Sequence, residues 1–222
     1  MVGKTLRDLC HPDITREDPN YLEEKDIKKR SGKNFGHYLE KYYFGYSNNS
    51  DSEADFLEAG LELKSSGLKL RDTKYYSMYV KKEPRLTLST INNAEIINEE
   101  FDTSSFYKKN KTLLIVFFDR DVNDKFEHNI DKKVIDTYLY TLANYDYEII
   151  KNDWELIRNK VRNCEAHNLR NRDTEHLESC GGESKAREYK NYFNQDEYCP
   201  EPGKNKRFAY KKDFLNNIID MA

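Results

Sequence analysis

The order of apolar and polar residues divides the chain into a middle region with strand patterns and flanking regions with helical ones. In residues 60–64, GLELK, apolar and charged residues alternate, as in a half-buried strand. Residues 75–80 and 85–91 are two further strand candidates, and the unbroken apolar run 113–118 predicts a central strand buried on both faces. Residues 134–142 fit either a strand or a helix period, and their state stays open.

Helical spacing appears on both sides of these strands. Residues 35–44 place five apolar side chains on one helical stripe, and residues 149–163 repeat the pattern around Trp154. Residues 211–220 predict a last helix, whereas Gly, Asn and Ser in 45–55 predict a loop. The charged first 30 residues predict short helices and turns. The members of the first stripe are Phe35, Tyr38, Leu39, Tyr42 and Tyr43.

Strands in the middle and helices around them predict an α/β or α+β fold with a mixed β-sheet flanked by helices. Charged residues make up 35% of the chain, which would suggest disorder if aromatic residues were scarce. The chain instead has 17 Tyr, 11 Phe and one Trp, so we expect a folded core that depends on Tyr and Phe. No internal repeat or low-complexity linker appears, and we expect one domain over residues 1–222.

The net charge of -3 gives no global basic signal for nucleic acid, so a nucleic-acid partner would require a local basic patch. Residues 203–212 hold five cations and no acid, and residues 158–172 hold five more cations. Either cluster alone is equally consistent with a solvated face.

No apolar run approaches the roughly 20 residues that a membrane span needs, and the N-terminus has no signal-peptide core. The four cysteines contain no CxxC pair, which favours reduced thiols in an intracellular protein. Cys164 and His167, followed by His176 and Cys180, resemble a zinc-ligand spacing. Only eight residues separate these two halves and many are charged, so we give zinc less weight than reduced thiols.

The segment ADFLEAGLELK, residues 54–64, contains the main candidate chemistry. On a strand, Glu62 and Lys64 would share one face while Leu61 and Leu63 point into the core. Asp55 ends the preceding loop and could fold back beside Glu62. Two converging carboxylates repel each other unless a cation lies between them.

Mg²⁺ suits such a pair, because it prefers oxygen ligands and needs only one or two carboxylates in addition to phosphate oxygens and water. Lys64 could orient or deprotonate a water, or stabilise the charge that develops on a phosphate. Together these groups point to metal-assisted hydrolysis of a phosphodiester. In so charged a chain the spacing alone is a weak signal, and ordinary strand-edge charges would explain it as well.

Several motifs in a fixed order strengthen the hydrolytic interpretation. Together they resemble the MutH-type endonucleases of the PD-(D/E)XK nuclease superfamily, and especially the type II restriction enzymes of this family that cut at GATC. The motifs are GHYLEKYYFG (36–45), EADFLEAGLELK (53–64), RLTLSTIN (85–92), FDTSSFYKKNKTLLIVFF (101–118), DYEIIKNDWELI (146–157), EHLES (175–179) and RFAYKKDF (207–214).

The resemblance implies a restriction-endonuclease-like core with metal-binding carboxylates at Asp55 and Glu62 and a catalytic lysine at Lys64. It also implies a further metal-site acid at Glu40, which its helical position alone would mark as a surface charge. A second active-site lysine is implied at Lys109. Lys108 and Lys111 are the register alternatives for it.

DNA reading in the family resembles a two-part scheme, with a loop after EHL and the segment before the last helix. The Arg-Pro of the nicking enzyme is matched here by Cys180-Gly181, and its base-reading Tyr falls at Ala209, beside Tyr210. Cys and Gly cannot bind guanine as an Arg does, so backbone groups of residues 179–184 could take over. The implied DNA-binding residues are Ser179, Cys180, Gly181, Gly182, Arg207, Ala209, Tyr210, Lys211 and Lys212.

We therefore expect a Mg²⁺-dependent type II restriction endonuclease in the bacterial cytoplasm. It would cut double-stranded DNA at or near GATC and leave a 5′ phosphate. In a single endonuclease domain, about residues 1–145 would form the catalytic part and about 146–222 the DNA-reading part.

Two other functions stay open. One is a non-cutting, sequence-specific DNA-binding module, although all five acid and lysine positions are filled. The other is a strand-specific nickase that needs a partner. One chain would hold one active site, so double-strand cleavage requires a dimer on DNA or two successive nicks. The chain could also be the catalytic half of a longer enzyme with a second domain.

Overall fold

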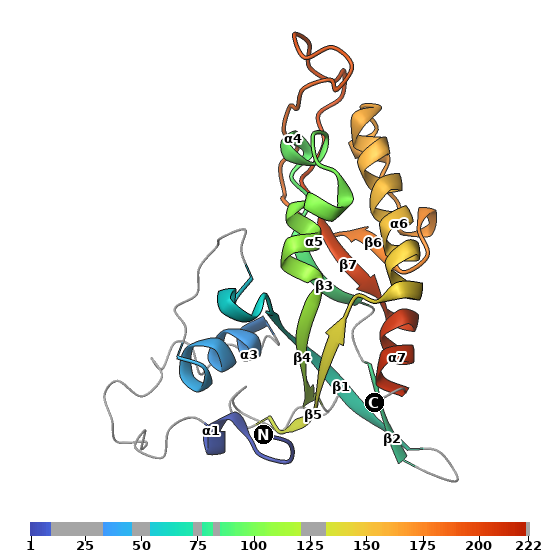
Figure 1. The fold of residues 1–222 in the computed structure, drawn as a ribbon. Helices are drawn as coiled ribbons and strands as arrows, with labels where there is room; N and C mark the ends of the chain where they lie inside the picture. Colours follow the sequence, from blue (N-terminus) through green and yellow to red (C-terminus); the bar gives the residue numbers. More distant parts are fainter. Residues whose placement is uncertain (10–32, 46–53, 73–76, 82–84, 121–131, 221–222) are drawn as a thin grey trace. The chain divides into compact units, whose positions relative to one another are not determined.

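A computed structural model of the chain describes residues 1–9, 33–45, 54–72, 77–81, 85–120 and 132–220 (Figure 1). The chain forms two compact units, each assembled from three separate segments. Unit 1 comprises Met1–Asp51, Leu63–Glu83 and Leu113–Tyr140, and unit 2 comprises Ser52–Glu62, Pro84–Thr112 and Thr141–Ala222.

Unit 1 contains a four-stranded sheet with the strand order β2-β1-β4-β5. Strand β4 occupies an interior position of this sheet, which confirms the predicted central strand, and β1 pairs with β2 in antiparallel fashion. The residues left open between helix and strand form β5. The elements are α1 (Leu6–Leu9), α3 (Lys33–Tyr38), the π-helical turn η1 (Leu39–Tyr43), β1 (Glu62–Asp72), β2 (Ser77–Lys81), β4 (Thr112–Asp119) and β5 (Val134–Thr141).

The predicted helix at residues 35–44 is present as α3 followed by η1, and it packs closely in unit 1. The Phe35 ring stacks on Phe118 with centroids 4.1 Å apart. The expected buried stripe is wrong at Tyr43, which is 39% exposed. A π-helical turn, with the N–H of Phe44 donating to the carbonyl of Leu39 five residues earlier, rotates the later residues away from the α-helical stripe.

Unit 2 contains a three-stranded antiparallel sheet with the order β3-β7-β6 (Figure 1). Its longest helix begins at Asn144, five residues earlier than predicted, and the predicted last helix is present as α7. The elements are η2 (Leu57–Ala59), β3 (Arg85–Thr90), α4 (Asn93–Ile96), η3 (Phe101–Thr103), α5 (Ser105–Asn110), α6 (Asn144–Arg162), η5 (Ala166–Asn168), η6 (Asn171–Asp173), β6 (Leu177–Cys180), β7 (Arg207–Lys211) and α7 (Lys212–Asp220).

The core of unit 2 is aromatic, as the composition predicted. Trp154 of α6 is fully buried and meets the ring of Phe101 edge to face at 5.7 Å. Phe106 of α5 lies 4.7 Å from Phe208 of β7, so α5 and the sheet share the same core. Aromatic pairs of this geometry add about 0.5–1.5 kcal/mol each beyond the area that they bury.

The α+β class with helices around β-structure is confirmed, and the strands divide into two sheets. Expectations for residues 10–32, 46–53 and 75–76 lie outside the described residues. Within the described part of the chain, no helix is both long and apolar enough to cross a membrane.

Candidate functional site

Asp55 and Glu62 of the 54–64 segment lie at the two ends of a short hairpin in unit 2, and the backbone of Asp55 contacts the carboxylate of Glu62. Phe56 and Leu61 exchange backbone hydrogen bonds of 2.9 and 3.3 Å, and Gly60 closes the turn with a left-handed φ of 58°. The N–H of Asp55 donates to Oε2 of Glu62 at 3.3 Å. The hairpin therefore brings the backbone of Asp55 to the carboxylate of Glu62, seven residues later in the sequence.

Glu62 is more enclosed than the strand pattern predicted. Leu63 is buried and Leu61 is half-buried, as expected for core-facing positions, but Glu62 is also only 2% exposed. A buried carboxylate is costly unless it is paired with donors or cations. The charge of Glu62 therefore depends on nearby donors and cations more than the charge of an exposed strand-edge residue would.

Lys109 supplies a cation next to this carboxylate. Its Nζ lies 3.8 Å from Oε2 of Glu62, and its side chain is largely buried, whereas Lys108 and Lys111 are exposed. Helix α5 positions this lysine, and the helix begins where Oγ of Ser104 accepts a hydrogen bond from the Tyr107 N–H at 3.0 Å. Among the three register alternatives, the geometry favours Lys109.

Unit 2 therefore brings Asp55, Glu62 and Lys109 together. Lys64 follows Glu62 by two residues on β1 and is half-buried, and it belongs to unit 1. Glu40 lies on η1, is half-buried and also belongs to unit 1.

The donor chemistry of Asp55 and Glu62 fits a hard divalent cation. In the described residues, no three His, Cys, Asp or Glu side chains form a group that could hold a metal ion. Mg²⁺ does not need such a group, since it commonly binds one or two protein carboxylates and completes its shell with phosphate oxygens and water. The two acids are thus compatible with Mg²⁺ bound jointly by protein and substrate.

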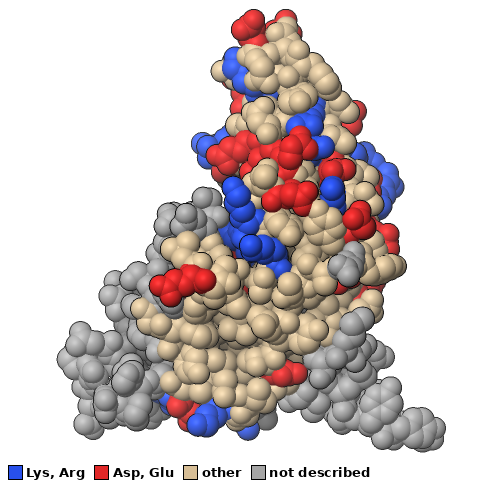
Figure 2. Space-filling model, viewed as in Figure 1, with Lys and Arg blue, Asp and Glu red and all other residues tan. Residues whose placement is uncertain are grey.

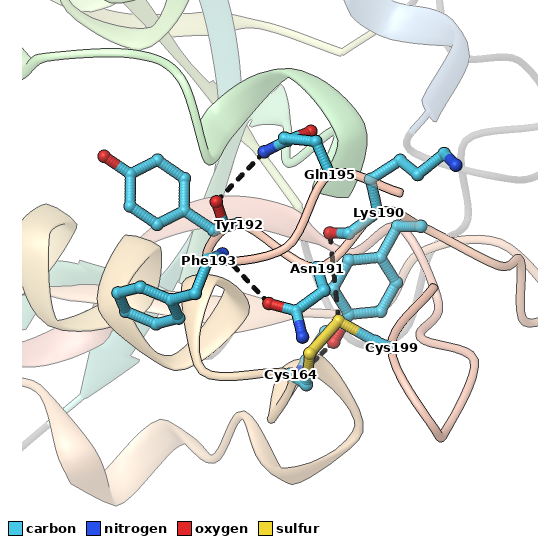
Figure 3. Close-up of a disulfide and its surroundings, with 9 residues drawn as sticks. Cys164, Lys190, Asn191, Tyr192, Phe193, Gln195 and Cys199 are labelled. Carbon is cyan, nitrogen blue, oxygen red and sulfur yellow. Dashed lines mark hydrogen bonds between the residues drawn. A yellow bond between two sulfur atoms is a disulfide. The ribbon is translucent and has the colours of Figure 1, made fainter. Parts of the chain in front are cut away.

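The zinc alternative is wrong, because Cys164, one of its four candidate ligands, forms a disulfide with Cys199 (Figure 3). The expectation of reduced thiols is wrong for this pair. The two residues are 35 positions apart in sequence, and only the fold brings their Cα atoms to 5.2 Å. The bond ties the end of α6 to the segment between β6 and β7. Cys180 is a free, buried thiol, and Cys10 lies outside the described residues.

Polar contacts around this disulfide hold the same segment in place. The Arg162 guanidinium lies over the Tyr192 ring at 4.3 Å. Figure 3 also shows the Phe193 N–H donating to Oδ1 of Asn191 at 2.9 Å and the Gln195 amide donating to the carbonyl of Tyr192 at 3.1 Å. The segment between β6 and β7 is therefore a structured connection.

The two segments expected to read DNA are neighbouring strands of one sheet. Strands β6 and β7 are antiparallel, with Ser179 opposite Phe208 and Cys180 opposite Arg207. Ser179 and Cys180 are buried, and the chain becomes exposed at Gly181. The two segments therefore cannot move independently of each other.

Glycine is required at the exposed turn after β6. Gly181 and Gly182 have φ values of 48° and 114°, a region that favours glycine. A Cβ on Gly182 would also collide with the carbonyl oxygen of Asn205, which accepts a hydrogen bond from the Glu183 N–H at 2.9 Å. The turn thus exposes backbone with no side chain to cover it.

On β7 and the start of α7, burial separates the expected DNA-binding residues into two groups. Ala209 and Tyr210 are fully buried, and the Tyr210 ring packs against Phe214 with centroids 5.0 Å apart. Arg207 and Lys212 are exposed, and Lys211 donates its ammonium to the carbonyl of Thr174. The exposed residues are the better placed for direct contact with a ligand.

Asp153 of α6 is a positioning residue that the sequence pattern did not reveal. Its carboxylate accepts three backbone hydrogen bonds, from Glu175 and His176 at 2.7 Å and from Leu177 at 2.8 Å. These donors lead directly into β6, so Asp153 fixes where that strand begins. The sequence did offer one indication of this role, since Asp153 is an acid next to Trp154 on the buried side of a predicted helix.

Basic and acidic side chains are interspersed over the part of the surface formed by α4, α5 and α6 (Figure 2). One acid of this region, Glu100, binds two nearby cations. Glu100 accepts from Arg158 at 2.7 Å and from Arg162 at 3.3 Å, and the hydrogen bond from Arg158 is the main reason that the pKa of Glu100 is lowered. Much of the basic cluster at residues 158–172 is therefore engaged within the protein.

Comparison with known proteins gives two matches. Residues 44–153 match the MutH family, described as the DNA mismatch repair enzyme MutH. The chain is 33% identical over 194 residues to the type II restriction enzyme Sau3AI of Staphylococcus aureus, and the match covers 86% of this chain. It covers 37% of that relative, so this chain corresponds to little more than a third of the relative's length.

Proposed function

Because the chain belongs to the MutH endonuclease family, we propose that it is a type II restriction endonuclease of duplex DNA. Its reaction would be Mg²⁺-dependent hydrolysis of a phosphodiester bond at or near GATC, leaving a 5′ phosphate. The observation that carries this proposal is the meeting of Asp55, Glu62 and Lys109 in unit 2, inside the family match. We also propose that it acts inside the bacterial cell, where this substrate is found.

Each charged group then has a role in the reaction. Asp55 and Glu62 would hold Mg²⁺, which supplies an activated water and neutralises charge on the leaving oxygen. Lys109 would donate hydrogen bonds to the non-bridging phosphate oxygens as negative charge develops on them. Lys64 would orient the attacking water or accept its proton, and Glu40 would assist the metal site.

The sheet of unit 2 supports the reading of DNA. The exposed glycines at 181 and 182 allow backbone to approach a groove closely, which a bulky side chain would prevent. Arg207 and Lys212 are exposed cations suited to phosphates, and such contacts position an enzyme without specifying sequence.

The share of the relative that this chain covers favours one alternative. Since the chain corresponds to 37% of that restriction enzyme, the matched activity could require further protein, either a second copy or an additional domain. In that case the isolated chain would nick one strand or bind without cutting.

The test is cleavage of a plasmid from a host that lacks adenine methylation, with Mg²⁺ and with a chelator. We expect Mg²⁺-dependent fragments that match the GATC map, and none with Glu62→Ala. Glu58→Ala is the matched control, because Glu58 is an exposed acid in the same hairpin. Equal cutting by Glu62→Ala and the wild type would exclude this active site, and binding without any cut or nick would favour the alternative.

A further inference from the structure

A salt bridge crosses the sheet of unit 2 from one edge strand to the other. Nε of Arg85 on β3 lies 3.0 Å from Oε1 of Glu178 on β6. These strands are separated by β7, so the two side chains together cross two strand spacings of about 4.8 Å each.

The residues on β7 explain how the bridge can form. Arg85 is opposite Lys211 and Glu178 is opposite Ala209, so the bridge crosses β7 diagonally between these two positions. Directly opposite residues and those two apart along a strand share a face of the sheet. The methyl group of Ala209 leaves room above β7 that a larger side chain would fill.

The two partners are enclosed to different degrees. Glu178 is only 5% exposed, and burial raises its pKa, although the charges of Arg85 and Lys211 oppose this shift. The Arg85 side chain is 29% exposed. The buried carboxylate of Glu178 can therefore hold the guanidinium of Arg85 in place, while part of the guanidinium stays accessible to a ligand.

The guanidinium retains donors for a ligand. Arginine has five N–H donors in a planar fork, and the atom that approaches Glu178 is Nε, whereas Nη1 and Nη2 carry the other four N–H groups. In the part of the chain that the structure describes, Arg85 makes no other hydrogen bond or ion pair. Arg207, which shares the same face two residues from Ala209, is exposed and adds positive charge there.

A planar pair of donors on a positively charged face matches one base edge in particular. The O6 and N7 atoms of guanine both accept hydrogen bonds in the major groove, and arginine binds them as a bidentate pair. Cys180 and Gly181 lack side chains that could donate in this way. We propose that Arg85 reads a guanine in the target sequence, with Glu178 as the positioning residue that holds its guanidinium.

This assignment rests on the proposed function, and the test removes single atoms from the DNA. Binding of the full chain is measured without Mg²⁺, on a GATC duplex, on the same duplex with 7-deazaguanine, and on a scrambled duplex. The wild type should lose about tenfold in affinity when the N7 acceptor is absent, since one bidentate contact discriminates by about that factor or more.

Variants of Arg85 should abolish this sensitivity. Arg85→Ala and Arg85→Lys should bind the normal and 7-deaza duplexes equally, and Arg85→Lys keeps the charge and thus the fold without the planar fork. Arg207→Ala is the matched control for lost charge. It should weaken binding to all three duplexes by one factor and keep the N7 sensitivity.

Variants of Glu178 separate positioning from simple structural support. Glu178→Gln retains the size of the side chain and an oxygen beside Nε of Arg85, and it should keep most of the N7 sensitivity. Glu178→Ala should lose the sensitivity while binding the scrambled duplex at least as well as the wild type, because a negative charge is gone.

Two results would overturn the assignment in different ways. If the wild type prefers GATC but folded Arg85→Lys keeps the full N7 sensitivity, Arg85 does not read guanine and the proposed function stands. If the wild type binds GATC no better than the scrambled duplex, the proposed specificity fails, and the assignment fails with it.

Discussion

The backbone N–H of Asp55 donates to the side-chain carboxylate of Glu62, so one candidate metal ligand is held by the main chain of the other. The hydrogen bond closes a hairpin whose backbone is already paired between Phe56 and Leu61. The position of Glu62 relative to Asp55 is therefore fixed by this turn. A change within the turn should alter the proposed metal site without any change to the acids themselves.

Gly60→Ala tests this dependence. Its φ of 58° costs a residue with a Cβ about 1–2 kcal/mol, and an added Cβ would meet only an ordinary contact with Lys111. We expect a higher Mg²⁺ concentration for half-maximal cleavage together with a small fall in the melting temperature. Asn tolerates this conformation better than Ala, so the Mg²⁺ dependence and melting temperature of Gly60→Asn should lie between those of the wild type and Gly60→Ala. An unchanged Mg²⁺ dependence in Gly60→Ala would show that the turn does not set the site.

Lys109→Met tests the assignment of the second lysine. Removing a donor that acts on developing charge should lower kcat by about 10²–10³-fold, with little effect on DNA affinity. Lys108→Met is the matched control, because Lys108 is its exposed neighbour on α5. Single-turnover cleavage and binding measurements give the two quantities. An equal loss of kcat in Lys108→Met would place the functional lysine in another register.

Asp153→Asn should loosen the start of β6. The amide can accept at one oxygen only, so one or two of three charge-assisted hydrogen bonds are lost, each contributing about 1.5–3 kcal/mol. We expect a lower denaturation midpoint and faster hydrogen exchange at the amides of Glu175, His176 and Leu177. Glu148→Gln, an exposed acid on the same helix, should change neither. Unaltered exchange at all three amides would contradict the positioning role.

Reduction of the Cys164–Cys199 disulfide should destabilise the protein. A bond that closes a sequence separation of 35 residues contributes about 3–4 kcal/mol in the chain-entropy account. We expect a lower melting temperature in reductant, and the double variant Cys164→Ser/Cys199→Ser should no longer respond to reductant. Cys180→Ser should respond like the wild type, because Cys180 is a free thiol. Four reactive thiols in the unreduced, denatured protein would show that the bond does not form.

Elements with a strong local pattern were predictable from the sequence. The apolar run of β4, the alternation in β3 and the spacing in α6 each report burial along one element. Strands β6 and β7 were not predicted, because neither strand alternates between buried and exposed residues. All four residues of β6 and three consecutive residues of β7 are buried. Their pairing depends on partners far away in the chain.

The candidate site divides in the same way. The proximity of Asp55 and Glu62 could be predicted from their spacing, because a short turn joins them. The contacts of Asp153 with β6, of Arg85 with Glu178 and of Cys164 with Cys199 could not be predicted. Each joins residues that only the finished fold brings together, and no local pattern records such a contact.

The division of the chain between the two units limits how the protein can be truncated, recombined or fused to another protein. The backbone passes from one unit to the other five times, since each unit is built from three separate segments. Neither unit can be expressed alone as one continuous piece of this chain. A truncation near the middle of the sequence, from either end, removes strands from both units. Recombination in evolution, or a fusion in the laboratory, would therefore have to transfer this chain as a whole.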